Sequence, residues 1–84
     1  IAERLAVLPA WNRDGDAIAR TFDCGDFQGA VDFLVAVTAA AERANHHPDV
    51  AISWKDVTFT LSTHSAGGLT AADFDLAGAI EALS

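Results

Sequence analysis

The residues of this sequence best suited to chemistry are its three histidines. His46 and His47 are adjacent and precede Pro48, and His64 follows a short way along the chain. A free imidazole has a pKa near ~6.5, so a group of imidazoles can supply both an acid and a base near neutral pH. Glu42 lies about one helical turn before His46, where a carboxylate can orient an imidazole. The pattern predicts acid–base catalysis by histidine.

Two other interpretations of the histidines stay open from the residues alone. A lone surface histidine is usually only solvated, although three in one short stretch are harder to explain this way. Three histidines can also bind zinc, with Cys24 or Glu42 as a fourth ligand. However, the sequence contains no C-x-x-C or H-E-x-x-H spacing, and adjacent histidines often point apart. Acid–base chemistry is therefore favoured over a metal site.

Hydrophobic periodicity indicates the elements that must position these side chains. Apolar residues recur with the helical period over 27–44, after Asp26 as a plausible N-cap. Pro48 ends this helix, because the residue before a proline is pushed out of the α region. Strict alternation over 50–63 predicts a hairpin that turns at Lys55-Asp56 and ends with His64 on its polar face. The histidines thus lie at a helix exit and a strand exit, where side chains can converge on a pocket.

The rest of the chain completes an α+β pattern. The remaining elements are a helix over 1–8, strands over about 10–13 and 17–24 joined at Asp14-Gly15, and a last helix after Thr70. Asp73 stands at the third helical position, where it forms a capping-box-like pair with Thr70. The order α-β-β-α-β-β-α predicts an antiparallel sheet with helices packed on one face. Cys24, Trp11 and Trp54 are interpreted as core or rim residues, and 66–68 as a loop.

Length and charge restrict the class of protein. The chain has 84 residues, 51% of them hydrophobic, and a formal net charge of −7. These values predict one folded domain over residues 1–84 and argue against disorder. The few basic residues are scattered, which argues against a nucleic-acid partner. A single cysteine fits a reducing compartment, and no apolar run is long enough for a membrane span, so we expect a cytoplasmic protein.

Several short motifs carry a resemblance to a known family. They are Glu42, His46-His47-Pro48, Trp54, Thr63-His64 and Asp73. Their spacing resembles the signature of the pterin-4a-carbinolamine dehydratases, whose animal members double as dimerisation cofactors of a homeodomain transcription factor. Upstream, Asp16-Ala17-Ile18 looks like part of the family's first hairpin. The resemblance extends over about residues 5–83 and implies a four-stranded antiparallel sheet with three helices on one face.

The resemblance also implies an activity and a set of site residues. The family dehydrates 4a-hydroxytetrahydropterin to quinonoid dihydropterin, which recycles the pterin of aromatic amino acid hydroxylases, and it needs no metal and no organic cofactor. By this resemblance His46 and His64 act as acid and base, His47 binds and orients the substrate, and Glu42 holds an imidazole in one tautomer. The expected substrate-binding residues are Asn45, Pro48, Ser62, Thr63, Ser65, Ala66 and Asp73. For Asp73, both an active-site role and a helix-capping role stay open. Ala66 stands where the animal members have a cysteine.

Partners follow from the same expectations. The ligand is a pterin, and an aromatic amino acid hydroxylase is the expected client. An open edge strand can pair across a two-fold axis, so we expect a homodimer or homotetramer. The alternative function is a non-catalytic interaction or regulatory module on the same fold.

Overall fold

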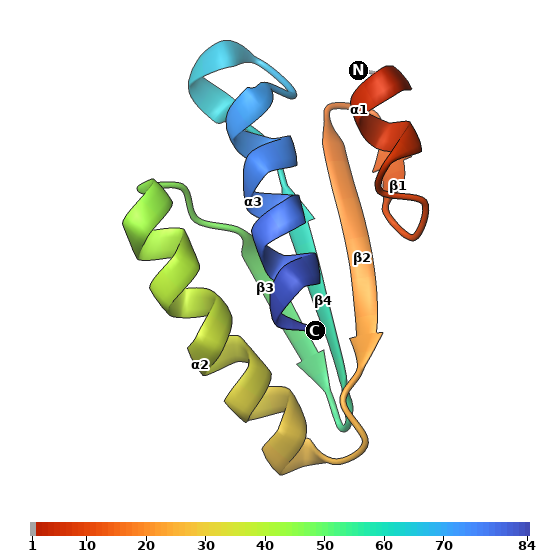
Figure 1. The fold of residues 1–84 in the computed structure, drawn as a ribbon, viewed down its shortest axis with the longest axis vertical. Coiled ribbons are helices and arrows are strands. Elements are labelled where there is room, and N and C mark those ends of the chain that lie inside the picture. Colours follow the sequence, from red (N-terminus) through yellow and green to blue (C-terminus); the bar gives the residue numbers. More distant parts are fainter. Residues whose placement is uncertain (1) are drawn as a thin grey trace.

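Four antiparallel strands form one layer of the molecule, in the order β1-β2-β4-β3 (Figure 1). The computed structural model describes residues 2–84. The strands are β1 (Asn12–Asp14), β2 (Ala17–Asp23), β3 (Asp49–Ser53) and β4 (Asp56–Leu61). The two hairpins therefore meet through β2 and β4, which pair along six residues of each strand. This arrangement confirms the α+β fold and its order of elements.

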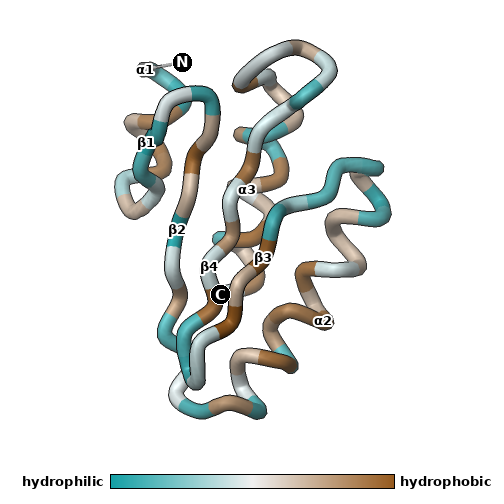
Figure 2. Tube along the Cα trace, turned by 180° about the vertical axis from the view of Figure 1, so that it is seen from behind, coloured by the Kyte–Doolittle hydropathy of each residue, from teal (hydrophilic) through white to brown (hydrophobic). Residues whose placement is uncertain are grey.

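Helices cover one face of this sheet. The helical elements are α1 (Ala2–Ala6), α2 (Phe27–Ala44), the 3₁₀ turn η1 (His64–Ala66) and α3 (Ala71–Leu83). The long helices α2 and α3 lie side by side in front of the strands in Figure 1. Arg4 of α1 donates a hydrogen bond to Asp75 of α3 at 2.7 Å, which ties the short helix to the same layer. Figure 2, viewed from behind, shows the strands on the side away from α2 and α3.

The core lies between the sheet and the helices. Alternation along β4 puts Val57, Phe59 and Leu61 on the helix side, each with no exposed surface. Ile18 and Phe22 of β2 face the same way, because they pair with Leu61 and Val57. On the open side, Thr21 and Thr58 share a hydrogen bond of 2.7 Å between their hydroxyls. The strand periodicity of the sequence therefore predicted which face is buried.

Both hairpin turns lie one residue away from the predicted positions. The first loop is Gly15-Asp16, since Asp14 pairs with Ala17, and the second is Trp54-Lys55, since Ser53 pairs with Asp56. Moving a two-residue turn by one position shifts the strand pairing by two residues and leaves every side chain on the same face. Hydrophobic alternation cannot distinguish such registers. Gly15 takes a φ of +60°, which suits glycine, whereas Trp54 takes +56° without that freedom.

Helix α2 has the predicted bounds, and the helix after Thr70 is confirmed, but several other element ends differ from the sequence expectation. The first strand is Asn12–Asp14 instead of about 10–13. The first helix spans Ala2–Ala6 instead of 1–8, and Ile1 lies outside the described residues. Strand β4 stops at Leu61, so His64 begins a 3₁₀ turn instead of ending the strand. Within residues 2–84, no helix is both long and apolar enough to cross a membrane.

Candidate active site

The exit of helix α2 places His46. Asn45 ends the helix in the left-handed conformation, with φ at 50°. Its backbone N–H bonds to the carbonyl of Glu42, and the N–H of His46 bonds to that of Ala41 at 3.1 Å. These bonds close the last turn and reverse the chain. The helix therefore ends at Asn45 because of this left-handed cap, and not because of Pro48 as predicted. The reversal of the chain brings His46 to Asp73 of α3.

Asp73 is the centre of the polar network at this end of the molecule. Its side chain is fully buried, and it is the one buried charged residue among residues 3–84. Oδ1 lies 2.5 Å from Nε2 of His46. Oδ2 accepts hydrogen bonds from the hydroxyl of Thr63 at 2.8 Å and from the backbone N–H of Thr70 at 2.9 Å. A buried carboxylate needs such partners, and these three come from separate segments of the chain.

The contact with Asp73 fixes the orientation of the His46 ring. An ionised carboxylate only accepts hydrogen bonds, so the nitrogen that faces it carries a proton. Nε2 of His46 donates its hydrogen bond to Asp73. Nδ1 is therefore the nitrogen that is left to exchange a proton with a ligand. The side chain of His46 is only 16% exposed. This is the arrangement of a positioned imidazole, with a buried carboxylate behind it.

Glu42 contacts His47 and not the other histidines. Oε2 of Glu42 lies 2.6 Å from Nε2 of His47, and both side chains are more than half exposed. The two residues stand at the edge of a small cavity of about 210 Å³. Most of the residues that line this cavity are apolar, Pro48 and Val50 among them. Of the two adjacent histidines, one therefore faces a buried acid and the other an exposed acid.

His64 lies in a second, larger cavity. The loop that carries it is closed by two backbone hydrogen bonds between Thr63 and Gly68, of 3.0 and 3.2 Å. His64 is exposed at the start of η1 and borders a cavity of about 360 Å³. Ser62 and Thr63 border it too. Since the hydroxyl of Thr63 also bonds to Asp73, the buried network reaches from His46 to the residue that precedes His64.

The structure brings most of the expected site residues to one end of the molecule. The α2–β3 connection, η1 and the start of α3 lie together at the top of Figure 1. Asn45, His46 and Pro48 come from the first of these segments, and Ser65 and Ala66, both exposed, come from η1. His47 and His64 border separate cavities. No group of three or more potential metal-ligating side chains is found within residues 2–84, so the geometry gives no support to the zinc interpretation.

The two tryptophans and the cysteine lie outside the site. Trp11 is 2% exposed, and its indole N–H donates to Glu81 at 2.8 Å, as suits a core residue. Trp54 is 69% exposed on the β3–β4 turn, at the end of the sheet opposite to η1 (Figure 1). Cys24 is half-buried and packs against the core.

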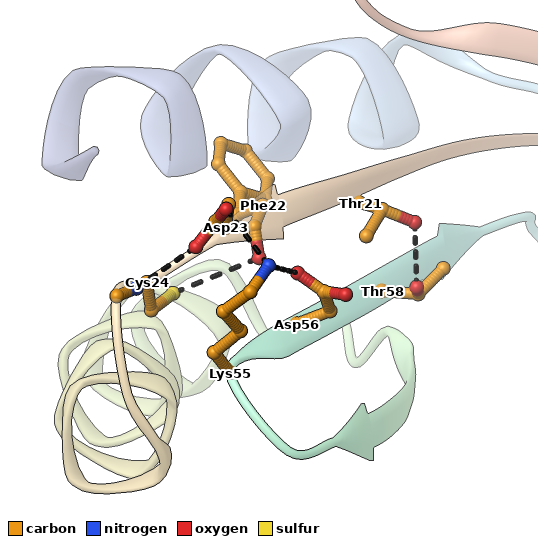
Figure 3. A network of polar contacts seen from close by, with 8 residues as sticks. Thr21, Phe22, Asp23, Cys24, Lys55, Asp56 and Thr58 are labelled. Carbon is orange, nitrogen blue, oxygen red and sulfur yellow. Dashed lines mark hydrogen bonds and ion pairs between the residues drawn. The ribbon is translucent and has the colours of Figure 1, made fainter.

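A separate network surrounds Lys55 at this far end, as Figure 3 shows. The ammonium group of Lys55 lies 2.9 Å from Asp23 and 3.4 Å from Asp56. The hydrogen bond from Lys55, with a second from the Gly25 amide, lowers the pKa of the Asp23 carboxyl. The pKa of Lys55 is raised by its bond to Asp23. This network stabilises the hairpin end and has no contact with the histidines.

Sequence reasoning missed two residues of the site. Asp14 and Asp16, from the β1–β2 hairpin, border the same cavity as His64. Asp16 belongs to a segment that carries part of the family resemblance, but no role was predicted for it. Its position near the His64 loop depends on the pairing of β2 with β4, which local patterns do not reveal.

Comparisons with known proteins identify the family of this chain. The family model described as pterin 4 alpha carbinolamine dehydratase matches residues 1–83. A protein of Nocardia farcinica assigned to the pterin-4-alpha-carbinolamine dehydratases is 55% identical over 84 residues, which cover 100% of this chain and 88% of the relative. A Roseiflexus castenholzii protein with the same assignment is 52% identical over 81 residues, covering 96% of this chain and 87% of its own.

Two solved structures are also similar. A crystal structure of a transcriptional coactivator/pterin dehydratase from Brucella melitensis has a TM-score of 0.92 at 33% identity, covering 98% of this chain and 89% of its own. A pterin dehydratase-like protein, identified as a RuBisCO assembly factor in the alpha-carboxysome, has a TM-score of 0.74 at 25% identity and covers 88% of each chain. The family model, the sequence relatives and the similar fold show that this chain belongs to the pterin-4-alpha-carbinolamine dehydratase family.

Proposed function

We propose that the protein dehydrates 4a-hydroxytetrahydropterin to quinonoid dihydropterin, and so recycles the pterin of an aromatic amino acid hydroxylase. One observation carries this proposal. The fully buried carboxylate of Asp73 binds His46 and also Thr63, the residue before His64. A buried charge is costly to maintain, so its use to hold an imidazole near a second histidine loop indicates positioned acid–base groups.

The reaction needs one proton delivered and one removed. The C4a–O bond breaks as the hydroxyl accepts a proton from an acid and leaves as water. The N5–H bond gives its proton to a base, and its electron pair forms the double bond between N5 and C4a. We assign these two transfers to His46, through Nδ1, and to His64. Such positioned groups typically contribute ~10²–10⁴-fold each to the rate.

The other site residues bind the substrate in this proposal. His47, held by Glu42, orients the ring from the exposed side. Asn45 and Pro48 flank the histidine pair, and the loop from Ser62 to Ala66 supplies backbone and hydroxyl groups. A pterin presents several donors and acceptors along its edge, which such groups can match. Because Asp73 is fully buried, we assign it a positioning role instead of the predicted substrate contact, and it also caps α3 through the Thr70 amide.

A turnover assay tests the proposal. A phenylalanine hydroxylase generates 4a-hydroxytetrahydropterin, and its conversion to quinonoid dihydropterin is followed with and without the protein. We expect acceleration by the wild type and a loss of ~10²-fold or more in kcat for His46→Ala and for His64→Ala. Circular dichroism checks that both variants fold. Unchanged turnover in both folded variants would remove the histidines from their assigned roles.

The proposal includes self-association. Strands β1 and β3 are the two edges of the sheet, and Val50 on β3 is 40% exposed. Pairing of an edge strand with its copy would bury unpaired backbone groups in a homodimer, and a second interface would give a homotetramer. Sedimentation equilibrium measures the mass directly. A monomer at micromolar concentration would contradict this part of the proposal.

A second candidate function is a non-catalytic interaction module. It is favoured by the similarity to a pterin dehydratase-like RuBisCO assembly factor, which has the same fold. Absence of turnover from a folded sample would support this candidate. For an interaction module, a variant in which all three histidines are alanine would still bind its partner and keep its regulatory effect. For a dehydratase, the same variant would lose its activity.

A further inference from the structure

The cavity beside His64 contains a carboxylate that the dehydration chemistry does not use. Asp16 borders this cavity from the β1–β2 turn, and His64 borders it from the loop after β4. The cavity volume of about 360 Å³ lies in the range of small-molecule sites and can hold a bicyclic ring. One wall therefore has an imidazole for proton transfer, and another wall has an acceptor of hydrogen bonds.

The backbone of the turn that carries Asp16 is well defined. Gly15 before it adopts φ +60°, and the Arg13 side chain donates a hydrogen bond to the Gly15 carbonyl at 3.0 Å. A Cβ atom at Gly68 would stand 3.5 Å from Oδ1 of Asp16, in van der Waals contact. Glycine at position 68 thus leaves one flank of the carboxylate free of any side chain. The Asp16 side chain is exposed and borders the cavity from this turn.

Asp16 also has no counter-charge of its own. None of the ion pairs that the structure forms within residues 2–84 involves it. By contrast, Asp23, Asp56, Asp73 and Asp75 each contact a basic or histidine side chain. An ionised carboxylate has two acceptor oxygens and can take two parallel hydrogen bonds from one planar donor edge.

A pterin has such an edge. Its 2-amino group and N3–H lie side by side on the pyrimidine ring, away from C4a and N5 where water is lost. We propose that Asp16 binds this edge and thereby selects 2-aminopteridines over their 2-oxo analogues. The proposal rests on the dehydratase function and adds a specificity-determining residue to it. A site built for the two donors would reject a ligand that presents a carbonyl at position 2, because two acceptors would then face each other.

The substitution Asp16→Asn gives a sharp test. It keeps the size of the side chain but replaces one acceptor oxygen with an NH₂ donor, which matches the 2-oxo analogue and mismatches the pterin. The probes, used in fluorescence titrations, are 6,7-dimethylpterin and 6,7-dimethyllumazine, which differ in the amino or oxo group at position 2 and in the hydrogen on N1 that accompanies the oxo form. We expect the wild type to prefer the pterin. Asp16→Asn should weaken pterin binding by roughly 10- to 100-fold and bring the preference to the lumazine.

Three further variants make the assignment specific. Asp16→Glu keeps the two acceptors and should retain the preference for pterin, although with lower affinity. Asp14→Asn alters the other carboxylate at the same cavity, and a switch there instead of at Asp16 would overturn the assignment. Asp32→Asn changes the same charge on α2 and should not alter the preference. In the turnover assay, Asp16→Asn should raise KM about tenfold or more while kcat stays within a few-fold.

The outcomes separate this inference from the proposed function. Normal turnover with an unchanged preference in Asp16→Asn would overturn the role of Asp16 and leave the dehydratase standing. Binding that switches with Asp16 in a protein without turnover would support the inference and contradict the dehydratase. A wild type that neither binds 6,7-dimethylpterin nor accelerates dehydration would overturn both.

Discussion

Replacement of Asp73 by Asn separates the structural role of this residue from its role at His46. Asparagine can turn its carbonyl oxygen toward Thr63 and the Thr70 amide, so both hydrogen bonds survive. Its NH₂ group then faces Nε2 of His46 and needs an acceptor there. The imidazole must move its proton to Nδ1, which is the wrong tautomer for the proposed transfer. We expect a loss of ~10²–10⁴-fold in kcat, as when a carboxylate behind a catalytic histidine becomes an amide.

The stability cost distinguishes two variants at this position. Asp73→Asn keeps its shape and loses only charge assistance, about 1–2 kcal/mol. Asp73→Ala leaves the buried donors of Thr70 and His46 without an acceptor, and we expect about 3–5 kcal/mol from the combined loss. At about 4–8 °C per kcal/mol for a domain of this size, Asp73→Ala lowers Tm by more than about 12 °C. Thermal denaturation followed by circular dichroism measures both shifts.

Asp75→Asn is the matched control on the same helix. Its ion pair with Arg4 is exposed, with 72% of the Asp75 side chain accessible, so its loss costs at most about 1 kcal/mol. We expect nearly wild-type kcat and Tm for this control. Two results would refute the reasoning: wild-type kcat in Asp73→Asn, or a Tm in Asp73→Ala within about 3 °C of the wild type.

Three predictions concern the far end of the sheet. Trp54→Asn should raise the free energy of unfolding by about 0.5–1 kcal/mol, because asparagine tolerates the φ of +56° and the tryptophan is mostly exposed. Burial, with the charges of Asp23 and Asp56, raises the pKa of the Cys24 thiol. Cys24 should therefore react with a disulfide reagent more slowly than a free cysteine at pH 8. The hydrogen bond from Lys55 is the main cause of the lowered pKa of the Asp23 carboxyl. The ionised carboxylate therefore stabilises the fold at pH values above its unfolded-state pKa, and this stabilisation is lost as the pH falls through its folded-state pKa. In Lys55→Met the NMR-measured pKa of Asp23 should rise.

Each of these predictions has a clear contrary result. Urea denaturation that shows Trp54→Asn less stable than the wild type would mean that the turn is not strained. A thiol as reactive as free cysteine would contradict the burial of Cys24. A pKa of Asp23 that stays constant in Lys55→Met would show that the ion pair does not form in solution.

The sequence alone predicted the order of the elements, the family and a hypothesis for the chemistry. The helical period over 27–44 predicted the bounds of α2, because its N-cap Asp26 and its apolar stripe are local features. Alternation predicted the buried faces of β2 and β4 for the same reason. The spacing of Glu42, the histidine pair and His64 was enough to indicate the family. These features depend on residues close in sequence, or on motif spacing, and both can be read without coordinates.

Tertiary structure decided which residues meet. Sequence spacing placed Glu42 near the histidine pair, but its partner is His47, while His46 is held by Asp73 from the last helix. Asp73 looked like a helix cap because capping is local, and its contact with His46 appears only when α2 and α3 lie side by side. Asp16 reaches the His64 cavity through the pairing of β2 with β4. Local patterns fix the face on which a side chain lies, and only the packing of distant segments determines what it contacts there.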